Sequence, residues 1–125
     1  MTRRGTIPQD TLTPCKVVSI PGRGRGVVAT RYIPQDKLVE VSPVILFRAV
    51  DVSDALNRYI FEWDDNHYAL ALGLGSLFNH SANPNLAVFL RMKGMKIAFM
   101  ATRDIERGEE LCHDYGYEPD GYDGG

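Results

Sequence analysis

The stretch from Leu70 to Asn85, LALGLGSLFNHSANPN, constrains the fold more than any other part of the chain. Its leucines and phenylalanine can bury apolar surface, and its two glycines let two backbone segments approach closely. An Asn-Pro pair near its end requires an extended or turn conformation. Polar residues between buried flanks are typical of a segment that holds a ligand. We therefore expect Asn79 and His80 to lie at the mouth of a packed element.

The length and the cysteine content limit the class of protein. A chain of 125 residues forms one domain that buries roughly 65–70% of the surface of its unfolded chain. Cys15 and Cys112 can make at most one disulfide and cannot form a four-cysteine zinc site, which favours free thiols in a reducing intracellular compartment. The first 14 residues lack the apolar core of a signal peptide, and no apolar run approaches the ~20 residues of a membrane-spanning helix. We expect a soluble protein without a membrane partner.

The net charge of −2 conceals an asymmetry along the chain. Up to Arg31 there are six basic residues and one acidic residue, whereas from Asp104 onward there are eight acidic residues and one basic residue. An acidic C-terminal part is suited to attract a basic peptide, and it is also typical of a solvated surface.

Strand-forming residues dominate and predict a mainly β fold. The predicted strands are residues 15–20, 27–30, 38–41, 44–47, 59–63, 68–72, 86–91, 95–102 and 110–113. Ser42-Pro43 predicts a break between the third and fourth strands, and Lys93-Gly94 predicts a hairpin. The one predicted helix is short, begins after Asp51 or Ser53 and ends at Arg58.

Two segments of the chain repeat the same pattern. Ala29–Ile33 reads ATRYI and Ala101–Ile105 reads ATRDI, and each follows an apolar strand and precedes a polar turn. Two copies are too few for a solenoid, so they indicate two equivalent strand-turn-strand arches in one domain, with coincidence as the alternative.

Two further motifs are suited to bind or process a ligand. Pro21–Gly26, PGRGRG, exposes backbone polar groups to a ligand, but no helix follows it as in a Rossmann motif and no Gly-Lys-Ser/Thr as in a Walker loop. One short copy does not indicate an RNA-binding RGG segment. In Glu109–Tyr117, EELCHDYGY, Tyr115 precedes a glycine, so a phenol can stand beside an open turn or simply pack. The backbone around Asn79 and His80 can offer the acceptor and donor that an adenine edge needs.

The residues that commonly bind metals or act as nucleophiles are poorly arranged for either role. The three histidines, His67, His80 and His113, have no i,i+4 spacing, and Cys112 points away from its neighbour His113 if both lie in a strand. A Cys/His catalytic pair would need distant partners such as Cys15 and His80. We expect no metal site.

Taken in this order, the three motifs closely resemble those of the SET-domain protein lysine methyltransferases. The Gly-x-Gly element appears as Gly24-Arg25-Gly26, and the Glu-Leu-x-x-x-Tyr-Gly element appears as Glu110–Gly116. The family's Asn-His-Ser-Cys-x-Pro-Asn element appears as Asn79–Asn85, with Ala82 in place of the cysteine. The likeness covers residues 15–117 and is greatest to the minimal SET proteins of large algal viruses and fungi.

The resemblance implies a SET-domain (β-clip-like) fold of small sheets with a C-terminal pseudoknot and one or two short helices. The SET domain would span residues 15–117, between a flexible N-terminal segment, 1–14, and a flexible tail, 118–125. S-adenosylmethionine would be the cofactor and Tyr115 the catalytic tyrosine, whose hydroxyl orients the methyl donor and the incoming amine. The implied cofactor-binding residues are Gly24, Arg25 and Gly26 at the methionine portion, Asn79, the His80 backbone at the adenine, and Tyr59, which rests on local alignment alone.

The implied activity is methylation of a protein lysine, most plausibly in a histone tail with H3 favoured. Such a chromatin regulator would be nuclear, would bind a basic peptide and would not recognise nucleic acid directly. The alternatives are a non-histone substrate, with a cytoplasmic location, and a catalytically weak SET-derived peptide-binding module. The substrate channel would be lined by Val41, Val88, His113 and Tyr117.

Several features depart from the family pattern. Val41, Val88 and His113 stand where other members have channel aromatics, which leaves the number of methyl groups transferred open. The cysteine-rich segment that closes the channel in many relatives is missing. Either the short tail closes the channel, with Tyr122 as a lid, or a second subunit does. Because the minimal viral relatives are dimers, we expect a homodimer.

Overall fold

The computed structural model describes residues 13–117, and these form nine strands in three small sheets. The predicted mainly β fold is confirmed. The segments predicted to be flexible, 1–14 and 118–125, lie outside the described residues except for the last two of the first. The strands are β1 (Cys15–Ile20), β2 (Gly24–Ala29), β3 (Leu38–Arg48), β4 (Ile60–Asp64), β5 (His67–Ala71), β6 (Asn79–His80), β7 (Leu86–Arg91), β8 (Lys96–Ala101) and β9 (Cys112–His113).

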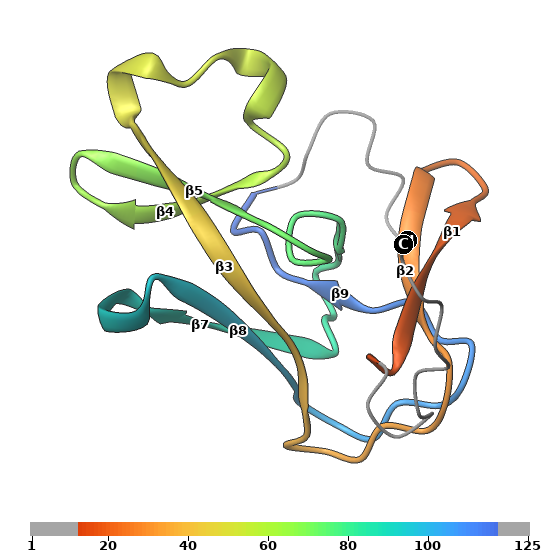
Figure 1. The fold of residues 1–125 in the computed structure, drawn as a ribbon. Helices are drawn as coiled ribbons and strands as arrows, with labels where there is room; N and C mark the ends of the chain where they lie inside the picture. The colour runs from red at the N-terminus through yellow and green to blue at the C-terminus, as the bar shows by residue number, and fades with distance from the viewer. Residues whose placement is uncertain (1–12, 118–125) are drawn as a thin grey trace, which may run out of the picture.

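The largest sheet has five strands in the order β4-β5-β3-β8-β7, with β3 at its centre. The antiparallel β1–β2 hairpin stands to one side, and β9 crosses between the hairpin and the large sheet (Figure 1). β6 and β9 pair with each other as a two-stranded parallel sheet. The predicted hairpin between residues 86–91 and 95–102 is confirmed as β7 and β8, joined by the 3₁₀ turn η4 (Met92–Gly94).

One predicted strand break is wrong, because β3 runs without interruption through Ser42 and Pro43. β3 pairs with β8 up to Pro43 and with β5 from Val44 onward. The proline therefore stands where the strand changes partner, just before the pairing with β5 begins at Val44. Its carbonyl still accepts a hydrogen bond from Leu72 at 2.9 Å.

The predicted helix is also wrong. The chain forms two separate 3₁₀ turns, η2 (Ala49–Asp51) and η3 (Asp54–Leu56), and no α-helix occurs in residues 13–117. Neither turn has a side-chain cap, and the carboxylate of Asp51 instead binds the guanidinium of Arg48 at 2.9 Å. The Asp51 side chain therefore pairs with Arg48 and does not cap the predicted helix. β2 differs slightly too, since it runs from Gly24 to Ala29 and so begins three residues before the strand predicted at residues 27–30.

The two ATR segments lie against each other, which the repeated pattern did not indicate. Ile33 and Ile105 form an antiparallel bridge in which each N–H donates to the other's carbonyl, at 2.9 and 2.8 Å. The backbone N–H of Asp36 donates to the Ala101 carbonyl at 2.8 Å. Gly108 stands at the equivalent position of the second copy, and its N–H donates to the Ala29 carbonyl, also at 2.8 Å. The two arches, residues 29–37 and 101–109, thus bind each other through equivalent hydrogen bonds.

The core lies between the large sheet and the segment that carries β9. Phe99 on β8 is fully buried, and its ring lies 4.9 Å from Phe78 and 6.0 Å from Phe61. The burial predicted for the stretch 70–85 holds for Phe78 but not for Leu72, which is 39% exposed. The other fully buried apolar residues are Val27, Ala29, Ile33, Ala69, Ile97, Ile105 and Leu111.

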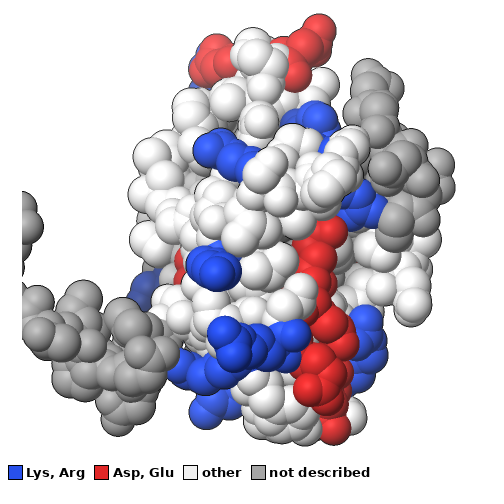
Figure 2. All heavy atoms as spheres, turned by 90° about the vertical axis from the view of Figure 1, so that its right-hand side faces the viewer, with Lys and Arg blue, Asp and Glu red and all other residues white. Residues whose placement is uncertain are grey.

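Both cysteines are buried and free, as predicted. No helix within residues 13–117 is long and apolar enough to cross a membrane. The charges that are segregated along the sequence interleave in space, since Figure 2 shows acidic side chains beside basic ones on the face around the β1–β2 hairpin. One such pair joins Arg23 to Glu110 at 3.1 Å.

Candidate functional site

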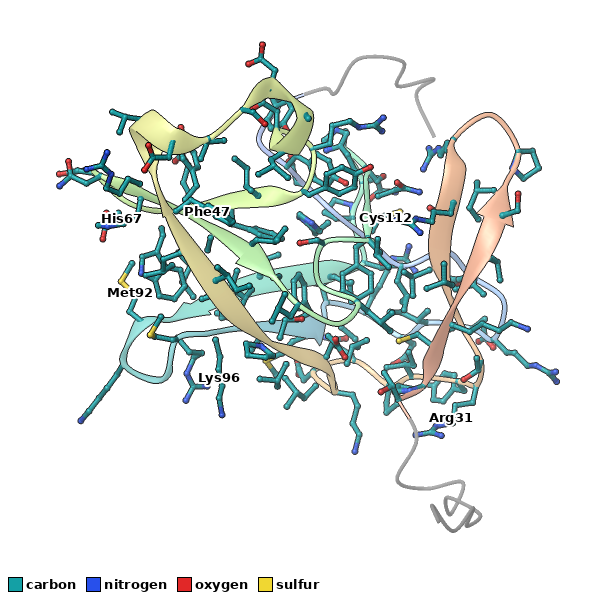
Figure 3. The ribbon with its side chains drawn as sticks, turned by 45° about the horizontal axis from the view of Figure 1, so that its top comes forward. Arg31, Phe47, His67, Met92, Lys96 and Cys112 are labelled. Carbon is teal, nitrogen blue, oxygen red and sulfur yellow. The ribbon has the colours of Figure 1, made fainter. Side chains whose placement is uncertain are left out.

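The opening stretch and the C-terminal motif lie side by side. β6 and β9 pair in parallel, and the N–H of Ser81 donates to the His113 carbonyl at 3.1 Å. The Asn85 side chain joins the same two segments, because its Nδ2 donates to the Glu110 carbonyl and its Oδ1 accepts from the Cys112 N–H, both at 2.9 Å. In Figure 3 Cys112 lies in the interior, between the large sheet and the β1–β2 hairpin. Residues 110–115 therefore pass through the middle of the molecule.

The glycine-rich turn meets these segments at Asn79. Nδ2 of Asn79 lies 3.0 Å from the carbonyl oxygen of Arg25 and 2.7 Å from Oε2 of Glu110. The other carboxylate oxygen of Glu110 binds the guanidinium of Arg23 at 3.1 Å, and the side chains of Arg23 and Glu110 are 11% and 21% exposed. A Cβ atom added at Gly26 would lie 2.6 Å from Oε2 of Glu110, so only glycine lets the backbone approach this closely. We name Arg23, Gly24–Gly26, Asn79 and Glu110 the glycine-turn cluster.

Tyr115 is held at three points beside this cluster. Its N–H donates to Nδ1 of His80 at 3.0 Å, and its hydroxyl donates to the Phe78 carbonyl at 2.6 Å. Its ring lies 4.8 Å from that of His113. Burial raises the pKa of the Tyr115 phenol to about 12, so the hydroxyl stays protonated at neutral pH. A fixed, protonated phenol can donate one hydrogen bond and accept others without carrying charge.

A cavity of about 770 Å³ opens beside Tyr115. One wall comes from the 3₁₀ turns and β4, and the other from Phe78, β7 and the segment after β9. The Tyr117 hydroxyl donates to the Asn57 carbonyl at 2.9 Å, so the end of the described chain contacts the opposite wall. The site residues predicted from the sequence that line this cavity are Tyr59, Val88, His113, Tyr115 and Tyr117.

His113 gives this cavity a neutral and largely apolar wall. Its ring stacks on Phe61 with centroids 5.3 Å apart, and the residue is 5% exposed. Burial lowers the pKa of His113 to about 4, so the imidazole is uncharged at neutral pH.

The structure does not bring every predicted residue to this cavity. Val41 is 40% exposed on β3 and does not line the cavity. Strand alternation places its neighbours Glu40 and Ser42 on the other face, where their side chains contact the turn at Gly73. The predicted channel role of Val41 is therefore not supported by its position. Gly24, Arg25, Gly26, Asn79 and His80 lie in or beside the glycine-turn cluster rather than along the cavity wall.

Sequence reasoning did not assign roles to several residues that build the site. Glu110 and Arg23 lie inside the quoted motifs but were not assigned to the site, and the ion pair between them joins residues far apart in the chain. Asn85 and Phe78 lie in the opening stretch, yet only the pairing of β6 with β9 shows what they hold. No local pattern contains this information.

Comparison with known proteins gives a consistent result. The family model described as SET domain matches residues 24–116. A Schizosaccharomyces pombe protein named histone-lysine N-methyltransferase, H3 lysine-37 specific, is 35% identical over 109 residues, which cover 83% of this chain and 74% of that protein.

Two solved structures share the fold. The crystal structure of a Plasmodium falciparum protein has a TM-score of 0.72 and 22% identity, over 86% of this chain and 96% of that one. The structure of KRYPTONITE with DNA, an H3(1–15) peptide and SAH has a TM-score of 0.66 and 27% identity, over 89% of this chain and 25% of that one.

Proposed function

This chain belongs to the SET-domain family, and on that premise we propose that it is an S-adenosylmethionine-dependent protein lysine N-methyltransferase. The observation that carries the proposal is the position of Tyr115. Its half-buried, protonated hydroxyl stands at the wall of the 770 Å³ cavity. Tyr115 binds Phe78 and His80, and Asn79 between them belongs to the glycine-turn cluster in which the three motifs meet.

The residues present fit the cofactor. Gly24 and Arg25 are exposed, and a Cβ added at Gly24 would meet no atom within 4 Å, so there is open space beside the turn. Asn79 offers an amide and the His80 segment a backbone edge. When bound, S-adenosylmethionine supplies a methyl group on a positively charged sulfur.

The residues of this chain must keep the lysine amine neutral and align it for the reaction. The attacking lysine must be neutral, and deprotonating an ordinary lysine at pH 7 costs about 4.6 kcal/mol. The walls at Phe78, Val88 and neutral His113 disfavour an ammonium by desolvation, and Arg58 adds a like charge. The Tyr115 hydroxyl then orients the amine for an in-line displacement, and such alignment supplies several kcal/mol more.

The proposed substrate is a histone tail, with H3 favoured, which places the protein in the nucleus as a chromatin regulator. The name of the fission yeast relative and the H3 peptide in the KRYPTONITE structure support this choice. Glu62 and Asp114 also line the cavity, but both residues are exposed, so water screens their carboxylates from the lysine amine. The same carboxylates can attract a basic peptide.

A transfer assay tests the proposal. The chain is incubated with labelled S-adenosylmethionine and either core histones or H3 peptides, and compared with Tyr115→Phe. We expect the variant to lose at least ~100-fold in kcat, while the lost hydrogen bond costs only about 1 kcal/mol of stability. Tyr32→Phe is the matched control, because Tyr32 is 50% exposed and does not line the cavity.

Each outcome bears on a different alternative. Label on another protein but not on histones supports a non-histone substrate. Binding of histone peptide without transfer supports the peptide-binding module. Absence of any binding heat with S-adenosylmethionine contradicts the proposal at its first step.

We also propose a homodimer formed through the outer face of the large sheet. Val41 on β3 and Phe89 on β7 both pair with Ala98 on β8, so the three residues form a row across the sheet. Val41 and Phe89 are 40% and 48% exposed, and Ile45 extends the same face. Sedimentation at micromolar concentration should give twice the 14.0 kDa of the chain, and Phe89→Glu should give the monomer. A monomeric wild type contradicts this proposal alone.

A further inference from the structure

Glu110 is a half-buried carboxylate that binds two different motifs at once. One oxygen binds Arg23 of the glycine-rich turn, and the other binds the amide nitrogen of Asn79. We propose that Glu110 is a positioning residue, which fixes the side-chain amide of Asn79 so that its carbonyl oxygen is presented to the ammonium group of the cofactor. The inference rests on the proposed function, because that cofactor carries a primary ammonium on its methionine portion.

The hydrogen bonds of Asn79 determine the orientation of its side-chain amide. A side-chain amide has two N–H donors on one atom and a carbonyl acceptor on the other. Both donors are used, at 3.0 Å on the Arg25 carbonyl and at 2.7 Å on Oε2 of Glu110. Both partners are acceptors only, so a flipped amide would bring its oxygen against two other oxygens. The orientation is therefore fixed, and the oxygen is what Asn79 can offer to a ligand.

The chemistry of that oxygen selects the kind of group that it binds. An amide carbonyl accepts hydrogen bonds and is attracted to cationic donors such as a primary ammonium. A flipped Asn79 would present an N–H₂ group instead, which repels an ammonium. The orientation of one amide thus decides whether the site accepts or rejects the cofactor's charged amine.

Only a carboxylate at position 110 can accept hydrogen bonds from both Arg23 and Asn79. Arg23 and the Asn79 nitrogen are both donors, so position 110 needs two acceptors. Glutamine at position 110 has the same shape but one acceptor. Its N–H₂ group would then face either the Arg23 guanidinium or the Asn79 nitrogen, and in the second case the Asn79 amide is driven to flip.

The Glu110 carboxylate and the Asn79 amide have no room to shift. A Cβ at Gly26 would lie 2.6 Å from Oε2 of Glu110 and 2.8 Å from Nδ2 of Asn79, so the turn backbone packs directly on this contact. The guanidinium of Arg23 is 11% exposed and holds the other carboxylate oxygen at 3.1 Å. The carboxylate is therefore fixed by the same turn that forms part of the proposed cofactor site.

The test compares two ligands by calorimetry on Glu110→Gln. The ligands are S-adenosylhomocysteine and its analogue in which hydrogen replaces the α-amino group. We expect Glu110→Gln to weaken the first at least tenfold and to change the second less than twofold, because the analogue has no ammonium to be recognised. In turnover, KM for S-adenosylmethionine should rise more than kcat falls. Equal weakening of both ligands shows a merely structural role and overturns the inference, as does wild-type affinity for both.

Two further variants make the result specific. Glu109→Gln is the matched control, because the neighbouring carboxylate binds Arg103 at the surface, and it should bind both ligands like the wild type. In an Asn79→Ala background, Glu110→Gln should add less than a twofold loss, since it acts through the amide that is already gone. An additive loss overturns the inference.

The outcomes also separate this inference from the proposed function. If the wild type binds neither ligand, the proposed function fails. If the wild type binds and the Gln variant keeps its preference for the amino-bearing ligand, only the inference fails. Should the Gln variant not fold, Glu110→Asp replaces it. The shorter side chain cannot reach both partners and should selectively weaken S-adenosylhomocysteine, whereas parallel weakening of both ligands overturns the inference.

Discussion

The buried imidazole of His113 should make the stability of the domain depend on pH, and His113→Phe should remove that dependence. Burial lowers the pKa of His113 from 6.5 to about 4. The unfolded chain therefore binds a proton at this residue between these two values while the folded chain does not, so the stabilisation is complete above pH 6.5 and is lost as the pH falls toward 4. The Asp114 backbone partly offsets the shift, and His80 adds to it.

The size of the effect follows from the two pKa values. Between pH 7 and pH 5 the wild type should lose about 2 kcal/mol through this residue, and about 3 kcal/mol by pH 4. Phenylalanine keeps the stacking on Phe61 and the contact with Phe99, whose ring centroids lie 5.3 and 6.0 Å from that of His113. Phenylalanine cannot bind a proton, so the variant should not lose the ~2 kcal/mol of unfolding free energy that His113 contributes between pH 7 and pH 5.

Urea denaturation at pH 7, 6 and 5 measures the effect. The difference in unfolding free energy between wild type and His113→Phe should shift by about 2 kcal/mol across this range, because other titrating groups contribute equally to both proteins. His67→Phe is the control, since His67 stands at the start of β5 with a side chain that is 38% exposed and paired with Asp64 at 2.9 Å. Curves of wild type and His113→Phe that stay parallel from pH 7 to pH 5 would refute the reasoning.

Two packing variants test other parts of the structure. Gly26→Ala would force a Cβ to within 2.6 Å of a Glu110 oxygen, and it should cost about 1–3 kcal/mol and weaken cofactor binding, as measured by thermal denaturation and calorimetry. Gly94→Ala is its control, because that Cβ would meet only a flexible lysine side chain at 3.9 Å, and a similar loss in both would contradict the close-packing argument. Phe99→Ala removes a fully buried ring and should cost about 3–5 kcal/mol in urea denaturation, where a cost below about 1 kcal/mol would show that the ring is not central to the core.

The sequence predicts those parts of the fold that depend on local patterns. β1 and β7 have the predicted bounds, because strand-forming residues fill both segments and turn residues flank them. The break at Pro43 was predicted wrongly, since a proline reads as a stop unless one knows that β3 changes partner there. The helix after Asp51 failed similarly, because a capping residue can be used instead by a neighbouring cation.

The candidate site shows the same division between local and distant information. The resemblance in the motifs led to Tyr115 and Asn79, and the structure brings their segments together through the pairing of β6 with β9. It also gives the side chain of His80 a part that the sequence did not suggest, because its ring holds the backbone of Tyr115. The partners of Glu110 could not be predicted, since contacts between distant residues depend on the path of the chain.

The mutual bonding of the two arches makes the domain one cooperative unit. Each arch depends on the other to satisfy its turn amide and its central isoleucine, so neither half of the chain offers a complete set of backbone partners by itself. A partly unfolded form that keeps only one arch would leave these groups unpaired, and opening should therefore be global rather than local. The amide hydrogens of Ile33 and Ile105, which bind each other's carbonyls at 2.9 and 2.8 Å, would then exchange with solvent at the same slow rate, set by unfolding of the whole domain.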